Sequence, residues 1–157
     1  FAFYMIIGYF GGASGTLVMG WLMDRMNPYW LITAYFVIDA VAIFSLGQIP
    51  PQLAVAFVTA LVVWNFAQVG GQTGINNLAT LSYPPEMRSS GIGWAGGFGR
   101  LGGIAFPALG GLALAAAMPL EMIMTVTAIP ALVIAALVFA LGVVNGGVIG
   151  GRQGAKA

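Results

Sequence analysis

Arg100 falls inside a long apolar run, and its chemistry is the clearest that the sequence offers. A charge near the middle of a bilayer costs about 3 kcal/mol on insertion scales, so this guanidinium should face a protein interior or a water-filled cavity. There it could bind an anionic substrate through a bidentate contact with a carboxylate. A structural ion pair is the alternative. We favour the binding role.

Asp39 lies midway along another apolar run and is the only acidic residue deep in such a run. It could take part in proton coupling or pair with Arg100. It could also be a neutral, protonated structural residue, because a buried acid can keep its proton. The sequence leaves these alternatives open.

Four amide side chains recur in a further apolar run at spacings of three, four and four residues: Asn65, Gln68, Gln72 and Asn76. At about 100° per residue they share a narrow arc of a helix. Because lipid cannot satisfy amides, they should either line a polar path or join helices by hydrogen bonds. We favour a path in which Gln72 and Asn76 bind a solute. Trp94 could add a flat apolar wall, although membrane aromatic residues are more often packing residues or interfacial anchors.

The composition indicates the elements that must hold these residues. Hydrophobic residues make up 60% of the 157-residue chain and charged residues only 6%, too few to build a surface that faces water. A net charge of +1 argues against a nucleic-acid partner. The chain has no Cys and no His, so no metal site or cofactor is predicted, and an enzyme is the least favoured class.

The hydrophobic pattern predicts helices that cross a membrane. A bilayer core about 30 Å thick needs about 20 apolar residues per helix. Polar and proline clusters separate five such segments, at residues 1–23, 29–47, 52–81, 89–118 and 121–144. The predicted fold class is therefore all-α, a polytopic transmembrane bundle with five spans. The Gly-rich residues 145–157 are expected to form a flexible tail.

The positive charges predict the orientation. Arg25 and Arg88 fall in the first and third loops, and Arg152 and Lys156 fall in the tail, so five spans place all four on one side. The positive-inside rule makes that side, and the C-terminus, cytoplasmic. The chain opens inside an apolar run without a charged leader, so we expect further helices upstream.

Several short patterns resemble one family of transporters. The segment Gly20-x-Leu22-x-Asp24-Arg25 resembles the cytoplasmic loop motif of the major facilitator superfamily. Two further stretches are similar to its aromatic acid:proton symporter group. One is GGQTGINNLA at residues 70–79, and the other is YPPEMR at 83–88, continued by GIGW at 91–94 and GFGR at 97–100.

This resemblance implies that the five spans are helices 8 to 12 of a twelve-helix carrier. It also implies proton-coupled import of aromatic carboxylates, such as hydroxybenzoates, across a bacterial inner membrane by alternating access. By the same resemblance Asp24, Arg88 and Arg100 are functionally important, and an N-terminal half is the partner. We assign Asp24, Arg25, Arg88 and Asp39 to coupling or conformational change. Asn27 and Pro28 depart from the family pattern. The alternatives are a carrier of a sugar, dicarboxylate or drug, and a helical scaffold without transport activity.

Overall fold

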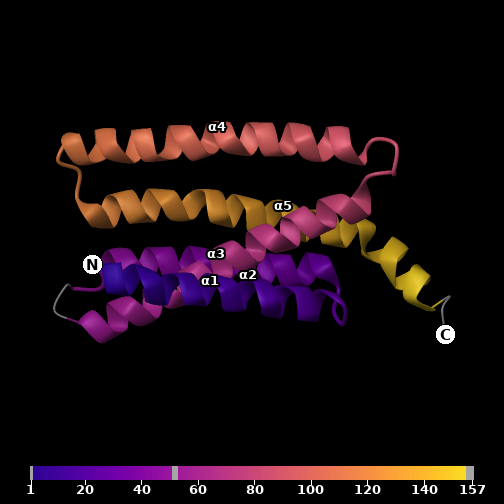
Figure 1. Cartoon of the computed structure of the whole chain (residues 1–157), viewed down its shortest axis with the longest axis horizontal. Coiled ribbons are helices and arrows are strands. Elements are labelled where there is room, and N and C mark those ends of the chain that lie inside the picture. Colours follow the sequence, from indigo (N-terminus) through magenta and orange to yellow (C-terminus); the bar gives the residue numbers. More distant parts are fainter. Residues whose placement is uncertain (1, 51–52, 155–157) are drawn as a thin grey trace.

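Five long helices make up the fold in the computed structural model, which describes residues 2–50 and 53–154, with side chains for 6–50 and 53–145. They are α1 (Ala2–Met23), α2 (Pro28–Gln48), α3 (Ala54–Ser82), α4 (Arg88–Ala115) and α5 (Leu120–Gly154) (Figure 1). Each is long and apolar enough to cross a membrane. A helix satisfies its own backbone polar groups, which hydrocarbon cannot do. The predicted all-α bundle with five spans is confirmed.

The turns explain where two helices begin and end. Asn27 caps α2, because its Oδ1 accepts a 3.0 Å hydrogen bond from the Tyr29 amide, and Pro28 follows at the first helical position. At the end of α4, Ala117 has a positive φ of 55°. The Met118 amide there donates to the Ala113 carbonyl, and the Ala117 amide donates to Leu114. This is a Schellman ending, and it stops α4 three residues before the predicted boundary at Met118.

The C-terminal helix is longer than the sequence suggested. The structure continues α5 through Gly154, where we expected a flexible tail from Asn145. The side chains of this extension, including Arg152, lie outside the described residues, as does the whole of Lys156.

The core is formed by α1, α2, α3 and α5. Helix α3 packs against both α1 and α2, and α2 also packs against α5. The buried core cluster consists mainly of apolar side chains from these helices: Met19, Tyr29, Leu31, Ile32, Tyr35, Phe36, Ala40, Leu78, Ala131, Ala135 and Val138. Helix α4 runs alongside this bundle (Figure 1) but buries none of its own residues. Among the described helices, α4 therefore gains the least from packing against its neighbours.

Glycines bring α1 and α3 close together. Contacts of Gly8 with Leu61, Gly12 with Val69 and Met19 with Gly74 show that the two helices run in parallel. Their closest approach is at Gly15, whose Cα leaves no room for a methyl group against the Phe66 backbone. Small residues allow such approaches between membrane helices. The glycines of α1 thus meet α3.

Candidate functional site

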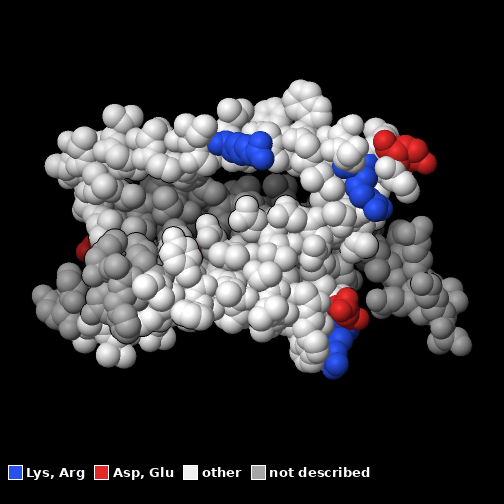
Figure 2. Space-filling model, viewed as in Figure 1, with Lys and Arg blue, Asp and Glu red and all other residues white. Residues whose placement is uncertain are grey.

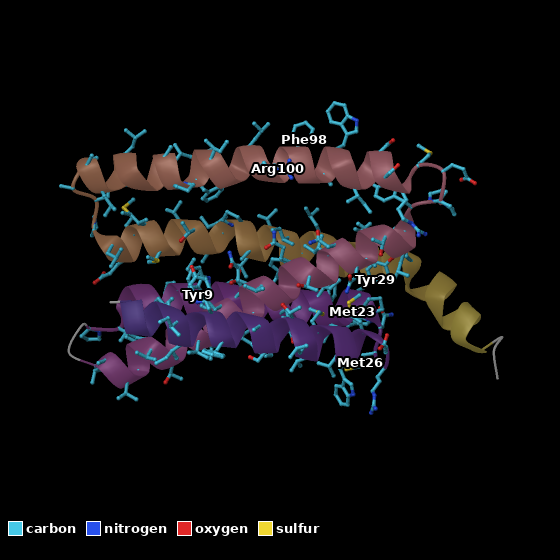
Figure 3. The ribbon with its side chains drawn as sticks, in the orientation of Figure 1. Tyr9, Met23, Met26, Tyr29, Phe98 and Arg100 are labelled. Atoms are coloured by element: carbon cyan, nitrogen blue, oxygen red, sulfur yellow. The ribbon has the colours of Figure 1, made fainter. Side chains whose placement is uncertain are left out.

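Arg100 lies about midway along α4 (Figure 3), twelve residues after Arg88 and so about 18 Å along the helix axis. The side chain is exposed, and within the described part of the chain no hydrogen bond or ion pair holds it. Helices α2 and α4 do not contact each other among the described residues, so the structure does not pair Arg100 with Asp39. The guanidinium is left available to an anion.

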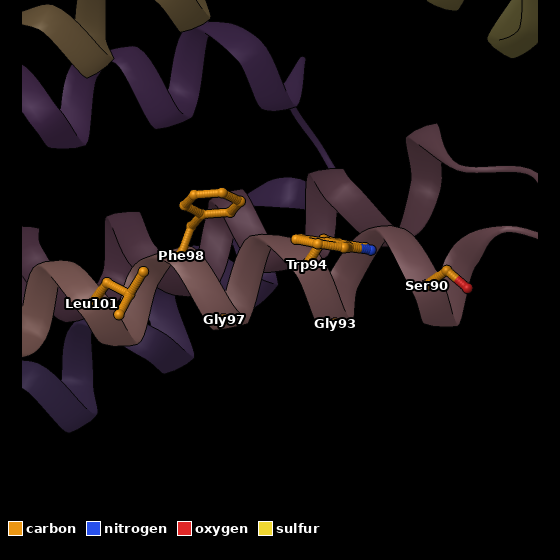
Figure 4. A pocket seen from close by; sticks show the side chains of 6 residues that line it. All are labelled: Ser90, Gly93, Trp94, Gly97, Phe98 and Leu101. Carbon is orange, nitrogen blue, oxygen red and sulfur yellow. The ribbon is translucent and has the colours of Figure 1, made fainter.

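An aromatic surface lies on another side of α4. Ser90, Gly93, Trp94, Gly97, Phe98 and Leu101 line a shallow depression of about 590 Å³ (Figure 4). The Trp94 and Phe98 rings stack with centroids 6.0 Å apart and planes 28° apart. Figure 3 shows Phe98 on the side of α4 that points away from the other helices.

Arg100 and the aromatic surface of α4 point in different directions from the helix axis. At about 100° per residue, Arg100 lies about 120° around the helix from Trp94. Arg100 and Trp94 therefore do not form one compact subsite in this arrangement. A ligand held by the guanidinium would meet the Trp94 side of the helix only if another element completed the site.

The amides of α3 share a face, but they do not behave alike. Asn65 is half-buried beside Gly8, and its Nδ2 donates a 3.0 Å hydrogen bond to the Leu61 carbonyl. Gln68, Gln72 and Asn76 are exposed. Asn65 therefore belongs to the α1–α3 interface, whereas the other three remain free to meet a solute or a further helix.

A hollow separates α4 from the remaining helices. Figure 2 shows it in the space-filling view, with a basic side chain on the α4 side. The depression on α4 is lined by neither Arg100 nor an amide of α3. The structure thus places the guanidinium and the amides on separate helices, without bringing them into contact.

The turns that carry Arg25 and Arg88 lie at one end of the bundle. Figure 1 shows the α1–α2 and α3–α4 turns at the same end, and Figure 2 shows charged side chains there. Arg25 and Arg88 are both exposed. The Arg25 guanidinium lies 4.2 Å from the centre of the Trp21 ring, a cation–π contact.

Asp24 borders a small polar pocket at this end. The pocket holds about 260 Å³ and is also lined by Asn77 and Thr80 of α3. The Asn77 amide donates to the Met23 sulfur at 3.7 Å, which joins the ends of α1 and α3. A change in the packing of α1 against α3 would therefore alter the surroundings of Asp24.

Asp39 differs from the other acids because it is buried, with 6% of its surface exposed. Tyr35, one turn earlier in α2, is also buried and stacks on Phe66 with centroids 5.4 Å apart. The Tyr35 hydroxyl donates a long 3.5 Å hydrogen bond to the Gly15 carbonyl. Sequence reasoning missed this junction of α1, α2 and α3. Its available signal was the recurrence of glycine in both helices, at positions 8, 11, 12 and 15 of α1 and at 70, 71 and 74 of α3.

Comparison with known proteins identifies relatives over most of the chain. The gallate transporter of Pseudomonas putida is 34% identical over 132 residues, which are 84% of this chain and 29% of that protein. The 4-hydroxybenzoate transporter PcaK of Pseudomonas aeruginosa is 29% identical over 144 residues, which are 92% of this chain and 32% of that protein. The chain is homologous to bacterial aromatic acid transporters.

The homology agrees with the motifs. It confirms the resemblance to the aromatic acid:proton symporter group of the major facilitator superfamily. The 3-(3-hydroxy-phenyl)propionate transporter of Escherichia coli is 37% identical over 108 residues, 67% of this chain and 26% of that protein. The chain spans about three tenths of the length of these curated relatives. No family model matches the chain, and no solved structure matches it.

Proposed function

We propose that this chain forms part of a proton-coupled carrier that imports small aromatic carboxylates across the bacterial inner membrane, with its C-terminus in the cytoplasm. The observation that carries the proposal is the similarity to the gallate and 4-hydroxybenzoate transporters over more than four fifths of the chain. Gallate and 4-hydroxybenzoate, the substrates for which these relatives are named, are both aromatic rings that bear a carboxylate.

Arg100 supplies the complementary charge for that carboxylate. It is exposed at mid-length of α4, where a cation needs an aqueous or protein-lined surrounding. Gln72 and Asn76 would hydrogen-bond the ring substituents, and Trp94 would join the site only where a further helix extends it around α4. Arg100 and the two amides come from helices that the structure leaves apart, so the carrier would bring these helices together during its cycle.

Further helices of the same carrier would complete the site. The chain matches about three tenths of each relative, and α4 buries no residue in the described bundle. A partner half beside α4 would cover its apolar surface and enclose the hollow. Alternating access would then move the two halves about a site near the middle of the membrane. Asp24, Arg25 and Arg88 at the cytoplasmic turns would latch one conformation, and Asp39 is the acid that this half offers for coupling.

Uptake by a chimera tests this function. The chimera replaces the matching segment of the Pseudomonas putida gallate transporter with this chain, and insertion into the membrane is verified by immunoblotting. We expect uptake of labelled gallate that collapses when the proton gradient is removed. A correctly inserted chimera that takes up no gallate and no 4-hydroxybenzoate would contradict the proposal.

The Arg100→Gln variant tests the binding residue. A hydrogen bond to a charged group contributes about 1.5–3 kcal/mol, so the apparent KM should rise about 10- to 100-fold. Leu109→Gln is the matched control, because Leu109 is also exposed on α4. Equal KM values for Arg100→Gln and the unmodified chimera would remove Arg100 from the site.

A further inference from the structure

The carboxyl group of Asp39 lacks a complete set of partners. Only 6% of the residue is exposed, and its Oδ1 atom is buried without a hydrogen bond among the described residues. A buried polar group is usually paired, and an unpaired one calls for an explanation. For an ionised carboxylate the need is greater, because an uncompensated buried charge costs several kcal/mol.

The helices packed against α2 provide no cation. Between Ala54 and Ser82, α3 contains no ionisable side chain at all. The part of α5 with described side chains has Glu121 at its first turn and no other ionisable side chain as far as Asn145. The only ionisable side chains of helix α1 are tyrosines, and Tyr35 is the nearest ionisable neighbour within α2. An ionised Asp39 would thus have no counter-ion among the described side chains of these helices.

The register of the helices shows what surrounds Asp39 instead. Ile32 packs on Gly74, Tyr35 on Gly70 and Phe36 on Gly71, so α2 and α3 are antiparallel. One turn further along α2, this register places Asp39 at the level of Ala67, which is fully buried.

Helix α5 contributes the same kind of side chain. The contacts of Tyr29 with Gly142 and of Gly47 with Met124 fix its antiparallel register against α2. That register places Asp39 at the level of Leu132, next to Ala131, which is buried like Ala128 and Ala135. Buried alanines thus lie near the level of Asp39 on both helices.

We propose that Asp39 is a proton-binding site, which holds its proton while α2 is packed between α3 and α5 and releases it when that packing opens. The neutral acid fits a buried position without a nearby cation, which would exclude the carboxylate. The step transfers one proton from the carboxyl oxygen to water and leaves a carboxylate. The small residues that face α2 allow neighbouring helices to shift, which would admit that water. The role of this site in transport rests on the proposed function.

Infrared spectroscopy tests the protonation directly. The chain has only four acidic side chains, so Asp24→Asn combined with Glu86→Gln and Glu121→Gln leaves Asp39 as the only one. In micelles of dodecyl maltoside, a detergent without carbonyl groups, we expect this variant to show the carbonyl stretch of a protonated carboxylic acid at neutral pH. The band should disappear when Asp39→Asn is added. A variant that shows only carboxylate bands attributable to Asp39 would overturn the proposal.

Transport separates this inference from the proposed function. In the gallate-transporter chimera, Asp39→Asn should retain exchange of labelled gallate across the membrane and lose accumulation driven by a proton gradient at least about tenfold, a difference of 1.4 kcal/mol. Accumulation equal to that of the unmodified chimera would refute the coupling role of Asp39 and leave the proposed function standing. If the unmodified chimera transports no aromatic acid, the proposed function fails, and the infrared result still decides whether Asp39 holds a proton.

Discussion

Gly15→Ala tests whether close contact between α1 and α3 supports the fold. A methyl group at Gly15 would lie 2.9 Å from the carbonyl carbon of Phe66 and 3.0 Å from its Cα. Non-bonded carbons prefer about 3.5–4.0 Å, so the two helices would have to separate by about 0.5–1 Å. Backbone atoms cannot rotate away as a side-chain tip can. The cost should fall in the range of about 1–3 kcal/mol that overpacking usually carries.

Helix propensity acts in the opposite direction and must be subtracted. Alanine is favoured over glycine inside a helix by about 1 kcal/mol. Gly15→Ala should therefore lower the free energy of unfolding by about 0–2 kcal/mol net. Gly20→Ala is the matched control, because a methyl group there would have no neighbour within 4 Å. It should raise the free energy of unfolding by up to about 1 kcal/mol.

The assay compares the two variants in one host lipid. Denaturant titration of the chain in nanodiscs, followed by tryptophan fluorescence, gives the midpoint of unfolding for each. We expect Gly15→Ala to unfold at lower denaturant than Gly20→Ala, with a difference of about 1–3 kcal/mol. Equal midpoints would refute the close approach of α1 and α3 at Gly15.

Three further variants test local features by the same titration. Ala117→Gly should stabilise the chain by about 1 kcal/mol, because the left-handed conformation at Ala117 is sterically unfavourable for any residue with a Cβ. A loss of stability would contradict the Schellman ending. Asn27→Ala should cost about 1 kcal/mol through loss of the cap on α2, and Asn27→Ser should recover most of it. Tyr35→Phe should cost about 0.5 kcal/mol, the low end for a hydrogen bond, because its bond to Gly15 is 3.5 Å long.

The five helices could be predicted because each is a long apolar run that ends at polar residues or proline. Their exact ends depend on turn geometry that composition does not reveal. The stop of α4 uses Ala117 in a conformation that glycine usually provides, so the turn carries no glycine signal. Asn27 and Pro28, which depart from the family pattern, proved to be a cap and a first helical residue for α2.

The candidate site was predictable only in part. Spacing along α3 placed Gln68, Gln72 and Asn76 on one face, and the structure leaves all three exposed. Spacing could not separate Asn65 from them, because its place beside Gly8 depends on how α1 packs. The surroundings of Asp39 also escaped prediction, since its neighbours on α3 and α5 are distant in sequence.

The central claim is that Arg100 and the exposed amides of α3 line one water-filled path for an aromatic acid. The chain has no cysteine, so Gln72→Cys adds a single thiol to this segment of the chimera, whose remaining cysteines are replaced by serine. We predict that a membrane-impermeant thiol reagent labels Gln72→Cys and that gallate slows the labelling. The exposed apolar Val63, also on α3, supplies the control Val63→Cys, which lipid should protect from the reagent. A Gln72→Cys variant that resists the reagent as Val63→Cys does, or that reacts equally fast with and without gallate, would contradict the account.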